Sequence, residues 1–271
     1  MINTIIFSYN RASQLRLLLE SIEKHAKDVF KVNIIYKFSR DDYKLGYEKL
    51  KNEQIIENIN WVNETSFKKD VLSLFNKDYK HTCFFTDDDI FYFPVKEDEI
   101  TKHLEEDQEV FCFSTRLGLN TTFCYTMNTD NNLFGVEEKG DFIKWNWSKS
   151  YMDYGYPLSV DGHIFRTKEI SKLVRNTAFH NPNTLEENLQ MFDTFPKEYM
   201  VAYTHSCLVN SPNNIINETH PNRKGEKYAY STLELNDKYL AGEVIDYNAI
   251  DFSNIIGAHQ ELDFTFKKIK K

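Results

Sequence analysis

Short apolar runs alternate with helix-like stretches over the first 115 residues, and this alternation limits the chain to a few folds. The runs are rich in β-branched and aromatic residues, and they are Ile2–Ser8, Val32–Phe38, Trp61–Val62 and Thr82–Thr86. Between them, apolar residues recur at helical spacing, at Leu15, Leu18, Leu19 and Ile22, within Asp41–Asn52, and at Phe67, Val71 and Leu74. The pattern predicts an α/β fold, a mixed but mostly parallel sheet flanked by helices.

The rest of the chain is less regular. Val110–Ser114 and Val201–Val209 read as strands, and residues 116–160 as loops with short antiparallel strands. Helices are expected at Thr167–Asn176 and Leu185–Phe192, and a long loop at Asn210–Gly225. Asn10 is a candidate cap for the first helix. No internal repeat or linker interrupts the sequence, so we expect a single domain over residues 1–271.

Composition excludes several classes of function. The chain has 33 Lys and Arg against 41 Asp and Glu, a net charge of −8, so no nucleic-acid partner is expected. No apolar run reaches the roughly 18–20 residues of a membrane span, and the start lacks the features of a signal peptide. We therefore expect a cytoplasmic protein, and its four cysteines to be buried free thiols.

Three consecutive acids, Asp87, Asp88 and Asp89, follow the strand-like run Thr82–Thr86. In an open α/β sheet, ligands bind beyond the carboxyl ends of the strands. Crowded carboxylates need a cation or hydrogen-bond donors to offset their charge, and oxygen ligands of this kind suit Mg²⁺ or Mn²⁺. The triplet is therefore a candidate metal site, with a solvated acidic turn as the alternative.

The segment Ile2–Leu19, which contains Ser8-Tyr9-Asn10-Arg11, and the acidic triplet together resemble the GT-A nucleotide-sugar glycosyltransferases. The closest likeness is to the family-two-like bacterial group, and it covers about residues 2–210. The resemblance implies a Rossmann-like GT-A domain with a nucleotide-binding half (1–115) and an acceptor-binding half with a C-terminal extension (116–271). It also implies a nucleoside-diphosphate sugar as donor, Mn²⁺ or Mg²⁺ as cofactor, and a saccharide or lipid-linked saccharide as acceptor.

The resemblance assigns roles to residues in the first half. It places the nucleotide against Phe7, Ser8, Tyr9, Arg11, Lys37, Asp87 and Asp88. It makes Asp87 and Asp89 metal ligands, with Asp89 the principal one. The plainer alternatives are a surface cation at the helix start for Arg11 and core packing for Tyr9.

A general base is expected near Asn183–Leu189, which resembles the x-Glu-Asp pattern of these enzymes but has Glu186-Glu187 in its place. A carboxylate at a helix start is stabilised as the anion by the helix dipole. Glu187 is slightly favoured by alignment to the motif. Alternatively, Thr184 and Glu187 form a capping box, which leaves Glu186 for function.

A second cluster, Ser159–Arg166, resembles the glycine-containing loop beside the donor sugar, with Asp161 as the third candidate catalytic residue. Arg116 follows a strand and could bind a phosphate or a sugar hydroxyl. Five nearby aromatic residues could stack on sugar rings or form a flap over the core. They are Trp145, Trp147, Tyr151, Tyr154 and Tyr156.

A C-terminal histidine completes the metal site in many GT-A enzymes. His205, His220 and His259 are the candidates here, and His259 is preferred. The basic tail, with Lys267, Lys268, Lys270 and Lys271, allows at most peripheral contact with the inner face of a membrane and otherwise reads as a solvated terminus.

The leading interpretation is a metal-dependent glycosyltransferase, as in bacterial surface polysaccharide synthesis. One alternative is a nucleotidyltransferase on a similar sheet, although Ser8–Gln14 contains no glycine for a phosphate-binding loop. Another is a catalytically inactive carbohydrate-binding module.

Overall fold

A computed structural model describes residues 1–191, 197–214, 216 and 223–269. The described residues form one nine-stranded sheet in the order β3-β2-β1-β4-β11-β6-β12-β10-β9. Its strands are β1 (Ile2–Tyr9), β2 (Phe30–Lys37), β3 (Asn60–Asn63), β4 (His81–Thr86), β6 (Val110–Ser114), β9 (Glu137–Lys139), β10 (Phe142–Asn146), β11 (His163–Arg166) and β12 (Tyr199–Tyr203).

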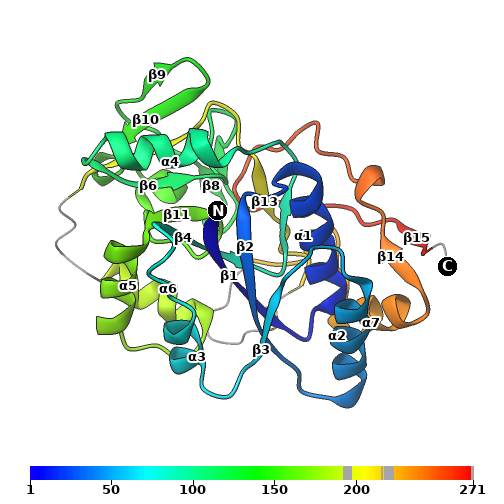
Figure 1. Cartoon of the computed structure of the whole chain (residues 1–271). Coiled ribbons are helices and arrows are strands. Elements are labelled where there is room, and N and C mark those ends of the chain that lie inside the picture. Colours follow the sequence, from blue (N-terminus) through cyan, green and yellow to red (C-terminus); the bar gives the residue numbers. More distant parts are fainter. Residues whose placement is uncertain (192–196, 215, 217–222, 270–271) are drawn as a thin grey trace.

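Helices cover both faces of this sheet (Figure 1). They are α1 (Ala12–His25), α2 (Asp41–Glu53), α3 (Phe67–Ser73), α4 (Glu97–Glu106), α5 (Thr167–Asn176), α6 (Pro182–Gln190) and α7 (Thr232–Leu240). Three further strand pairs lie outside this sheet: β5 (Asp89–Phe91) with β13 (Leu208–Asn210), β7 (Phe123–Cys124) with β8 (Thr129–Asp130), and β14 (Glu243–Ile245) with β15 (Phe266–Lys268). Three short 3-10 helices, Trp147–Lys149, Met152–Gly155 and Tyr247–Ala249, are also described.

Strand directions confirm the predicted fold class. Only β11 and β10 run against the other strands of the nine-stranded sheet among the described residues. The chain passes from β1 to β2 and β3 on one side and then crosses to β4 on the other side of β1. The carboxyl ends of β1 and β4 therefore flank a topological switch point, where open α/β sheets bind ligands.

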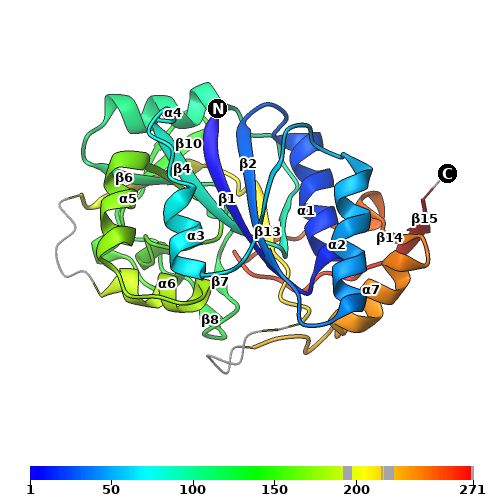
Figure 2. The same ribbon diagram turned by 60° about the horizontal axis from the view of Figure 1, so that its bottom comes forward.

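Alternating residues of β1 supply both halves of the core, as expected for a strand buried on its two faces. Ile6 packs in one hydrophobic cluster with Leu15 of α1. Ile5 and Phe7 pack in the other with Phe67 of α3. Figure 2 shows the two layers, with α1 and α2 on one face of the sheet and α3, α5 and α6 on the other.

The first helix buries the predicted apolar stripe, but its cap differs from the prediction. Arg11 occupies the N-cap position and makes no side-chain capping bond. Asn10 instead adopts a left-handed conformation, with φ of 57°. The Asn10 side-chain Nδ2 donates to the Ser39 hydroxyl (2.9 Å), and the side-chain Oδ1 accepts from the Ser39 N–H (2.9 Å). Asn10 thus ties the end of β1 to the loop after β2.

The apolar run Val201–Val209 is divided between two strands. Tyr199–Tyr203 forms β12 in the large sheet, whereas Leu208–Asn210 forms β13 and pairs antiparallel with β5. This pairing sets Asn210 opposite Asp89. The predicted helix from Leu185 begins earlier, at Pro182, and Phe192 lies outside the described residues.

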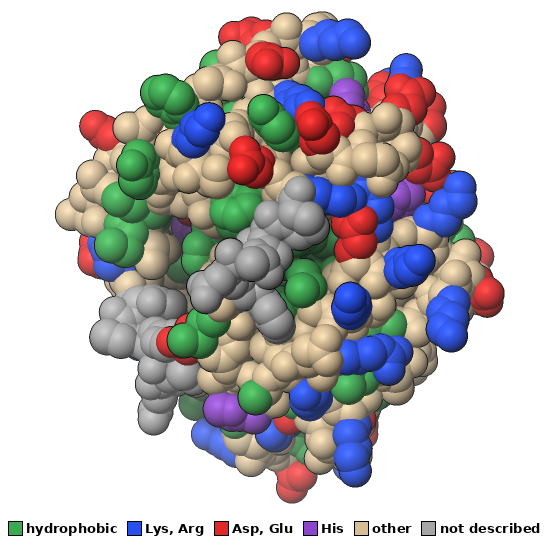
Figure 3. Space-filling model, turned by 90° about the vertical axis from the view of Figure 1, so that its left-hand side faces the viewer, with side chains coloured by type: hydrophobic (Ala, Val, Ile, Leu, Met, Phe, Trp, Pro, Cys, Tyr) green, Lys and Arg blue, Asp and Glu red, His purple; other side chains and the backbone are tan. Residues whose placement is uncertain are grey.

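No helix in the described part of the chain is long and apolar enough to cross a bilayer. The four cysteines are buried free thiols, as predicted. On the face shown in Figure 3, described Lys and Arg side chains are interspersed with other side chains and form no continuous basic surface. In the tail, Lys267 pairs with Asp246 and Lys268 with Glu243, while Lys270 and Lys271 lie outside the described residues.

Candidate active site

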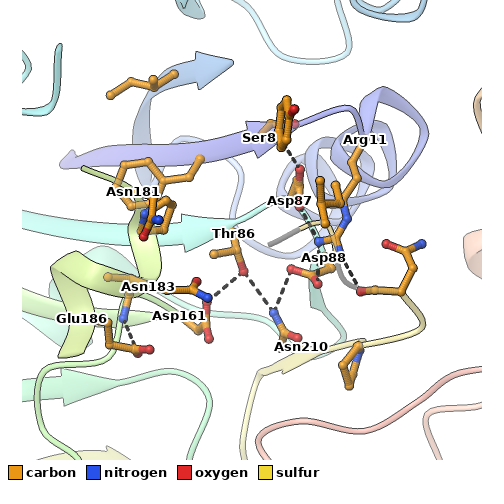
Figure 4. Close-up of a pocket in the computed structure, with 18 of the residues that line it drawn as sticks. Ser8, Arg11, Thr86, Asp87, Asp88, Asp161, Asn181, Asn183, Glu186 and Asn210 are labelled. Carbon is orange, nitrogen blue, oxygen red and sulfur yellow. Dashed lines mark hydrogen bonds and ion pairs between the residues drawn. The ribbon is translucent and has the colours of Figure 1, made fainter. Parts of the chain in front are cut away.

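A cavity of about 670 Å³ lies at the carboxyl ends of β1, β2 and β4. This is the switch point at which the strand order reverses, and the volume suits a small-molecule ligand. Figure 4 shows two groups of side chains in it. Arg11, Asp87 and Asp88 lie on one side, Asp161 and Glu186 on the other, and Thr86 between them.

Ten of the residues singled out from the sequence line this cavity. They are Phe7, Ser8, Tyr9, Arg11, Lys37, Asp87, Asp88, Asp161, Glu186 and His259. Of the candidate metal ligands and bases, Asp89 and Glu187 do not belong to the lining. The fold thus brings together residues that lie up to 252 positions apart, from Phe7 to His259.

Arg11 holds the first two acids of the triplet. Its Nη1 donates to Asp87 Oδ1 at 2.9 Å and to Asp88 Oδ2 at 2.8 Å, and all three side chains are largely buried. The Tyr9 N–H donates to the second oxygen of Asp87 at 3.1 Å. Burial raises the pKa of Asp87 to about 6, although the Arg11 charge opposes this shift. Arg11 is therefore an internal counter-ion and not a surface cation.

Asp89 has a different environment from its neighbours. It is fully buried, and its Oδ2 accepts from the Thr86 N–H at 2.9 Å while its Oδ1 accepts from the Asn210 amide at 3.2 Å. Burial raises its pKa well above the ordinary value, and the charges of Asp161 and Asp88 act in the same direction. These contacts close the turn after β4 and place Asp89 outside the cavity lining, so its predicted role as principal metal ligand stays a prediction.

Gly162, the residue after Asp161, occupies a backbone position that requires glycine. Gly162 has φ of +75°, and a Cβ there would lie 2.4 Å from Leu208 and 2.6 Å from Thr115. The Gly162 N–H donates to the Phe84 carbonyl at 2.9 Å. This bond fixes the loop against β4 and sets Asp161 beside the acidic turn.

Three side chains hold the Asp161 carboxylate. Thr86 Oγ1 donates to it at 2.8 Å, and Arg116 Nη1 and His259 Nε2 lie at 3.4 Å. Burial favours a raised pKa for Asp161, but His259 and Arg116 reverse this and lower the pKa below the ordinary value. Asp161 is therefore held as the anion.

Arg116 supports Asp161 from outside the cavity. It is buried, it also pairs with Asp153 at 3.3 Å, and it is not part of the cavity lining. The predicted contact with a ligand phosphate or hydroxyl therefore does not match its position.

The two glutamates of α6 point to different surroundings. Glu186 lines the cavity, and its Oε1 accepts from the Val160 N–H at 3.0 Å. Burial raises the pKa of Glu186, the Asp161 charge adds to the shift, and Arg116 opposes it. Glu187 is exposed and outside the lining. The structure thus places Glu186 in the cavity lining and Glu187, which the motif alignment favours, outside it.

The capping box of α6 lies three residues before the predicted one. Asn181 is the N-cap and accepts from the Thr184 N–H at 2.8 Å, while Thr184 Oγ1 accepts from the Asn181 N–H at 3.1 Å. Pro182 occupies the first helical position, where its missing N–H costs nothing. The earlier start places Glu186 in the second turn, facing the cavity.

Several lining residues were missed by the sequence reasoning. Asn210 donates to Thr86 Oγ1 at 3.0 Å and to Asp88 Oδ1 at 3.0 Å. In the sequence, Asn210 directly follows the apolar residues Leu208 and Val209. This position at a strand end was the signal that could have identified it as a lining residue. Other polar lining residues without a local signature include Glu64, Thr86, Tyr125, Thr126, His180, Asn181, Asn214 and Arg223.

The aromatic cluster and two histidines are not part of the cavity lining. Trp145 and Tyr154 are buried in the core, and the Trp145 indole donates to the Tyr154 carbonyl at 3.0 Å. Tyr151 is exposed, and none of the five aromatic residues lines the cavity. His205 lies outside the lining and packs against Phe93, with their ring centroids 4.6 Å apart. His220 lies outside the described residues.

The cavity suits a cation that arrives with a phosphate ligand. Within the described residues, no three His, Cys, Asp or Glu side chains form a ready metal cage. Mg²⁺ is usually held by one or two carboxylates together with substrate phosphates. Asp88 is the carboxylate that could take this part, because it lines the cavity and its side chain is 11% exposed, while its oxygens also accept from Arg11 and Asn210. The described lining also has five acids against three Lys or Arg, so an added cation would offset the excess charge.

Comparison with known proteins gives one clear relative. No family model matches the chain. The chain is 25% identical over 217 residues to the bifunctional glycosyltransferase pgtA of Dictyostelium discoideum. The match covers 69% of this chain but only 28% of the relative.

The solved structures that match this chain share few identical residues with it. Residues 1–349 of Staphylococcus aureus TarS match with a TM-score of 0.41 and 16% identity, over 74% of this chain and 60% of that one. A cytidylyltransferase from Leptospira borgpetersenii matches with a TM-score of 0.42 and 10% identity, over 76% of each chain. At these scores the likeness assigns no function. The sequence relative confirms that the chain resembles a glycosyltransferase over more than two thirds of its length.

Proposed function

We propose that this protein transfers a sugar from a nucleoside diphosphate to a hydroxyl group of an acceptor. The observation that supports this best is the shared cavity. It combines an acidic turn at the switch point with Glu186, a carboxylate of raised pKa. The similarity to a glycosyltransferase supports the same reaction class.

The donor diphosphate would lie beside Arg11, Asp87 and Asp88. Asp88 would hold a divalent cation, which would stabilise the negative charge of the leaving diphosphate. Arg11 keeps Asp87 and Asp88 in place, because its guanidinium bonds to both. Asp89 would act indirectly, by fixing the turn that presents them.

Glu186 would act as the general base. Its carboxylate would take the proton of the acceptor hydroxyl while the oxygen attacks the anomeric carbon of the donor. The bond between that carbon and the diphosphate breaks, and its electron pair leaves with the diphosphate. One such displacement inverts the anomeric configuration. Asp161, held as the anion nearby, would orient sugar hydroxyls.

The acceptor would enter beside Glu186. Here His180, Asn181 and Asn183 line the cavity, and their polar groups suit a saccharide, free or lipid-linked. Surface polysaccharide synthesis is a process that needs such an acceptor.

An assay of nucleotide-sugar turnover tests this proposal. Purified protein with Mn²⁺ should release a nucleoside diphosphate from at least one common nucleotide sugar, and more in the presence of mixed saccharide acceptors. Glu186→Gln should lower the rate by about 10²–10⁴-fold, the usual contribution of a general base, whereas Glu187→Gln should keep it. Release of pyrophosphate from nucleoside triphosphates would favour a nucleotidyltransferase. Sugar binding without any turnover would favour an inactive module.

A further inference from the structure

Tyr9, Lys37 and Glu64 lie in a row at one end of the cavity. They stand at the carboxyl ends of β1, β2 and β3, which are consecutive in the sheet. Tyr9 is opposite Lys37 in the register of β1 and β2. Lys37 Nζ donates to Glu64 Oε1 at 2.9 Å. In the order of the sheet, this row extends from β1 on the side opposite to β4 and β11, the strand that Asp161 precedes.

The spacing of the strands suits a nucleoside. Three strand intervals separate β3 from β4, which is about 14 Å at roughly 4.8 Å per interval. With the diphosphate beside Asp87 and Asp88, as in the proposed function on which this inference rests, the base would lie toward Lys37 and Glu64. The sugar would lie on the opposite side, toward Glu186.

The ion pair retains unused hydrogen-bonding capacity. Among the described residues, Glu64 accepts a side-chain hydrogen bond only from Lys37, through Oε1, and Lys37 donates only to Glu64. A carboxylate offers two acceptor oxygens, and an ammonium group offers three donors. The pair therefore presents a donor beside two acceptors at the rim of the cavity.

We propose that Lys37 and Glu64 select a guanine base, so that the donor is a guanosine-diphosphate sugar. Guanine presents an acceptor, O6, followed by two adjacent donors, N1–H and the N2 amino group. Lys37 would donate to O6, and the Glu64 carboxylate would accept both donors in a bidentate arrangement. All three polar groups on that edge of guanine are then satisfied.

The other bases match this pair less well. Uracil and thymine also place an acceptor beside a donor, but their O2 would face a carboxylate oxygen without a hydrogen between them. Adenine and cytosine offer one amino group beside a ring acceptor, which leaves a carboxylate oxygen unpaired. Because a site built to pair with a polar group discriminates against ligands that lack it, guanine is favoured.

Binding measurements with free nucleotides test the selection without an acceptor or a known sugar. Isothermal titration of the full chain with GDP, UDP, dTDP, CDP and ADP, each with Mn²⁺, should give the lowest Kd for GDP by about tenfold or more, the discrimination of one good bidentate pair. In Glu64→Gln, the side-chain amide offers one acceptor oxygen and one donor amino group in place of the two carboxylate oxygens. The substitution should weaken GDP binding about tenfold, and it should not weaken UDP binding, because the new amide can donate to O2 of uracil.

A matched control is Glu23→Gln, which removes an ion pair with Lys27 at 2.8 Å on the surface of α1. It should leave all five affinities unchanged. Tighter binding of another nucleotide, unaffected by Glu64→Gln, would overturn the guanine assignment while the proposed function stands. Failure of every nucleotide to bind would overturn the proposed function itself.

Discussion

Glu186, the proposed general base, has surroundings that favour its protonated form. Burial and the Asp161 charge raise its pKa above the ordinary glutamate value, so it remains protonated to a higher pH than an exposed glutamate. A protonated carboxyl group cannot accept the proton of the acceptor hydroxyl. We therefore expect the transfer rate to fall on the acid side, with a midpoint above the ordinary glutamate pKa, in initial rates measured across a pH series.

Protonation of Glu186 does not itself destabilise the folded state. A carboxyl group with a raised pKa in the folded state binds its proton more tightly there, so its protonation on acidification favours the folded state. Thermal midpoints and nucleotide affinity, measured over the same pH series, provide the control. An acid limb at the pH of an ordinary glutamate would show that Glu186 is not the base.

Much of the cavity lining could be predicted at the residue scale, because strand ends mark the ligand-binding edge of a parallel sheet. Ser8, Tyr9 and Lys37 follow this rule. Asp89 does not, because its burial depends on pairing between β5 and β13, which are 116 residues or more apart. Its bond to the Thr86 N–H also closes a turn that the sequence does not show.

At the scale of elements, the start of α6 decides which glutamate enters the cavity. Asn181→Ala removes the N-cap acceptor for the Thr184 N–H and should lower the free energy of unfolding by about 1 kcal/mol. Because it also loosens the turn that carries Glu186, we expect the transfer rate to fall as well. Urea denaturation and the turnover assay measure the two effects.

The matched control is Ser231→Ala at α7, where Ser231 accepts from the Glu234 N–H at 3.0 Å. This cap lies outside the cavity lining. Its loss should lower stability by a similar amount and leave the rate unchanged. Equal rates in the two variants would contradict a positioning role for the α6 cap.

Elements with one clear periodicity could be predicted closely. The strand Val110–Ser114 and the helix Thr167–Asn176 have the predicted bounds. The run Val201–Val209 reads as one strand, but it divides between β12 and β13 at the polar residues Thr204, His205 and Ser206. Polar residues also occur within half-buried strands, so the sequence pattern does not mark this break. The roles of Trp145 and Tyr154 could not be decided from the sequence, since aromatic residues suit both a core and a sugar site.

At the scale of the whole molecule, charge and topology lead to the same expectation. The chain carries a net charge of −8, and its cavity is lined by more acids than bases among the described residues. An anionic diphosphate is repelled by such a cavity unless a cation accompanies it. Nucleotide binding at the switch point should therefore depend on a divalent metal.

Thermal denaturation with nucleoside diphosphates, with and without Mn²⁺, tests this claim most directly. A ligand that binds the folded state raises its apparent stability, so at least one nucleotide should raise the midpoint, and only when Mn²⁺ is present. Asp88→Asn should abolish the metal-dependent part, whereas Glu187→Gln should retain it. A midpoint unmoved by every nucleotide, or raised equally without metal, would contradict the account.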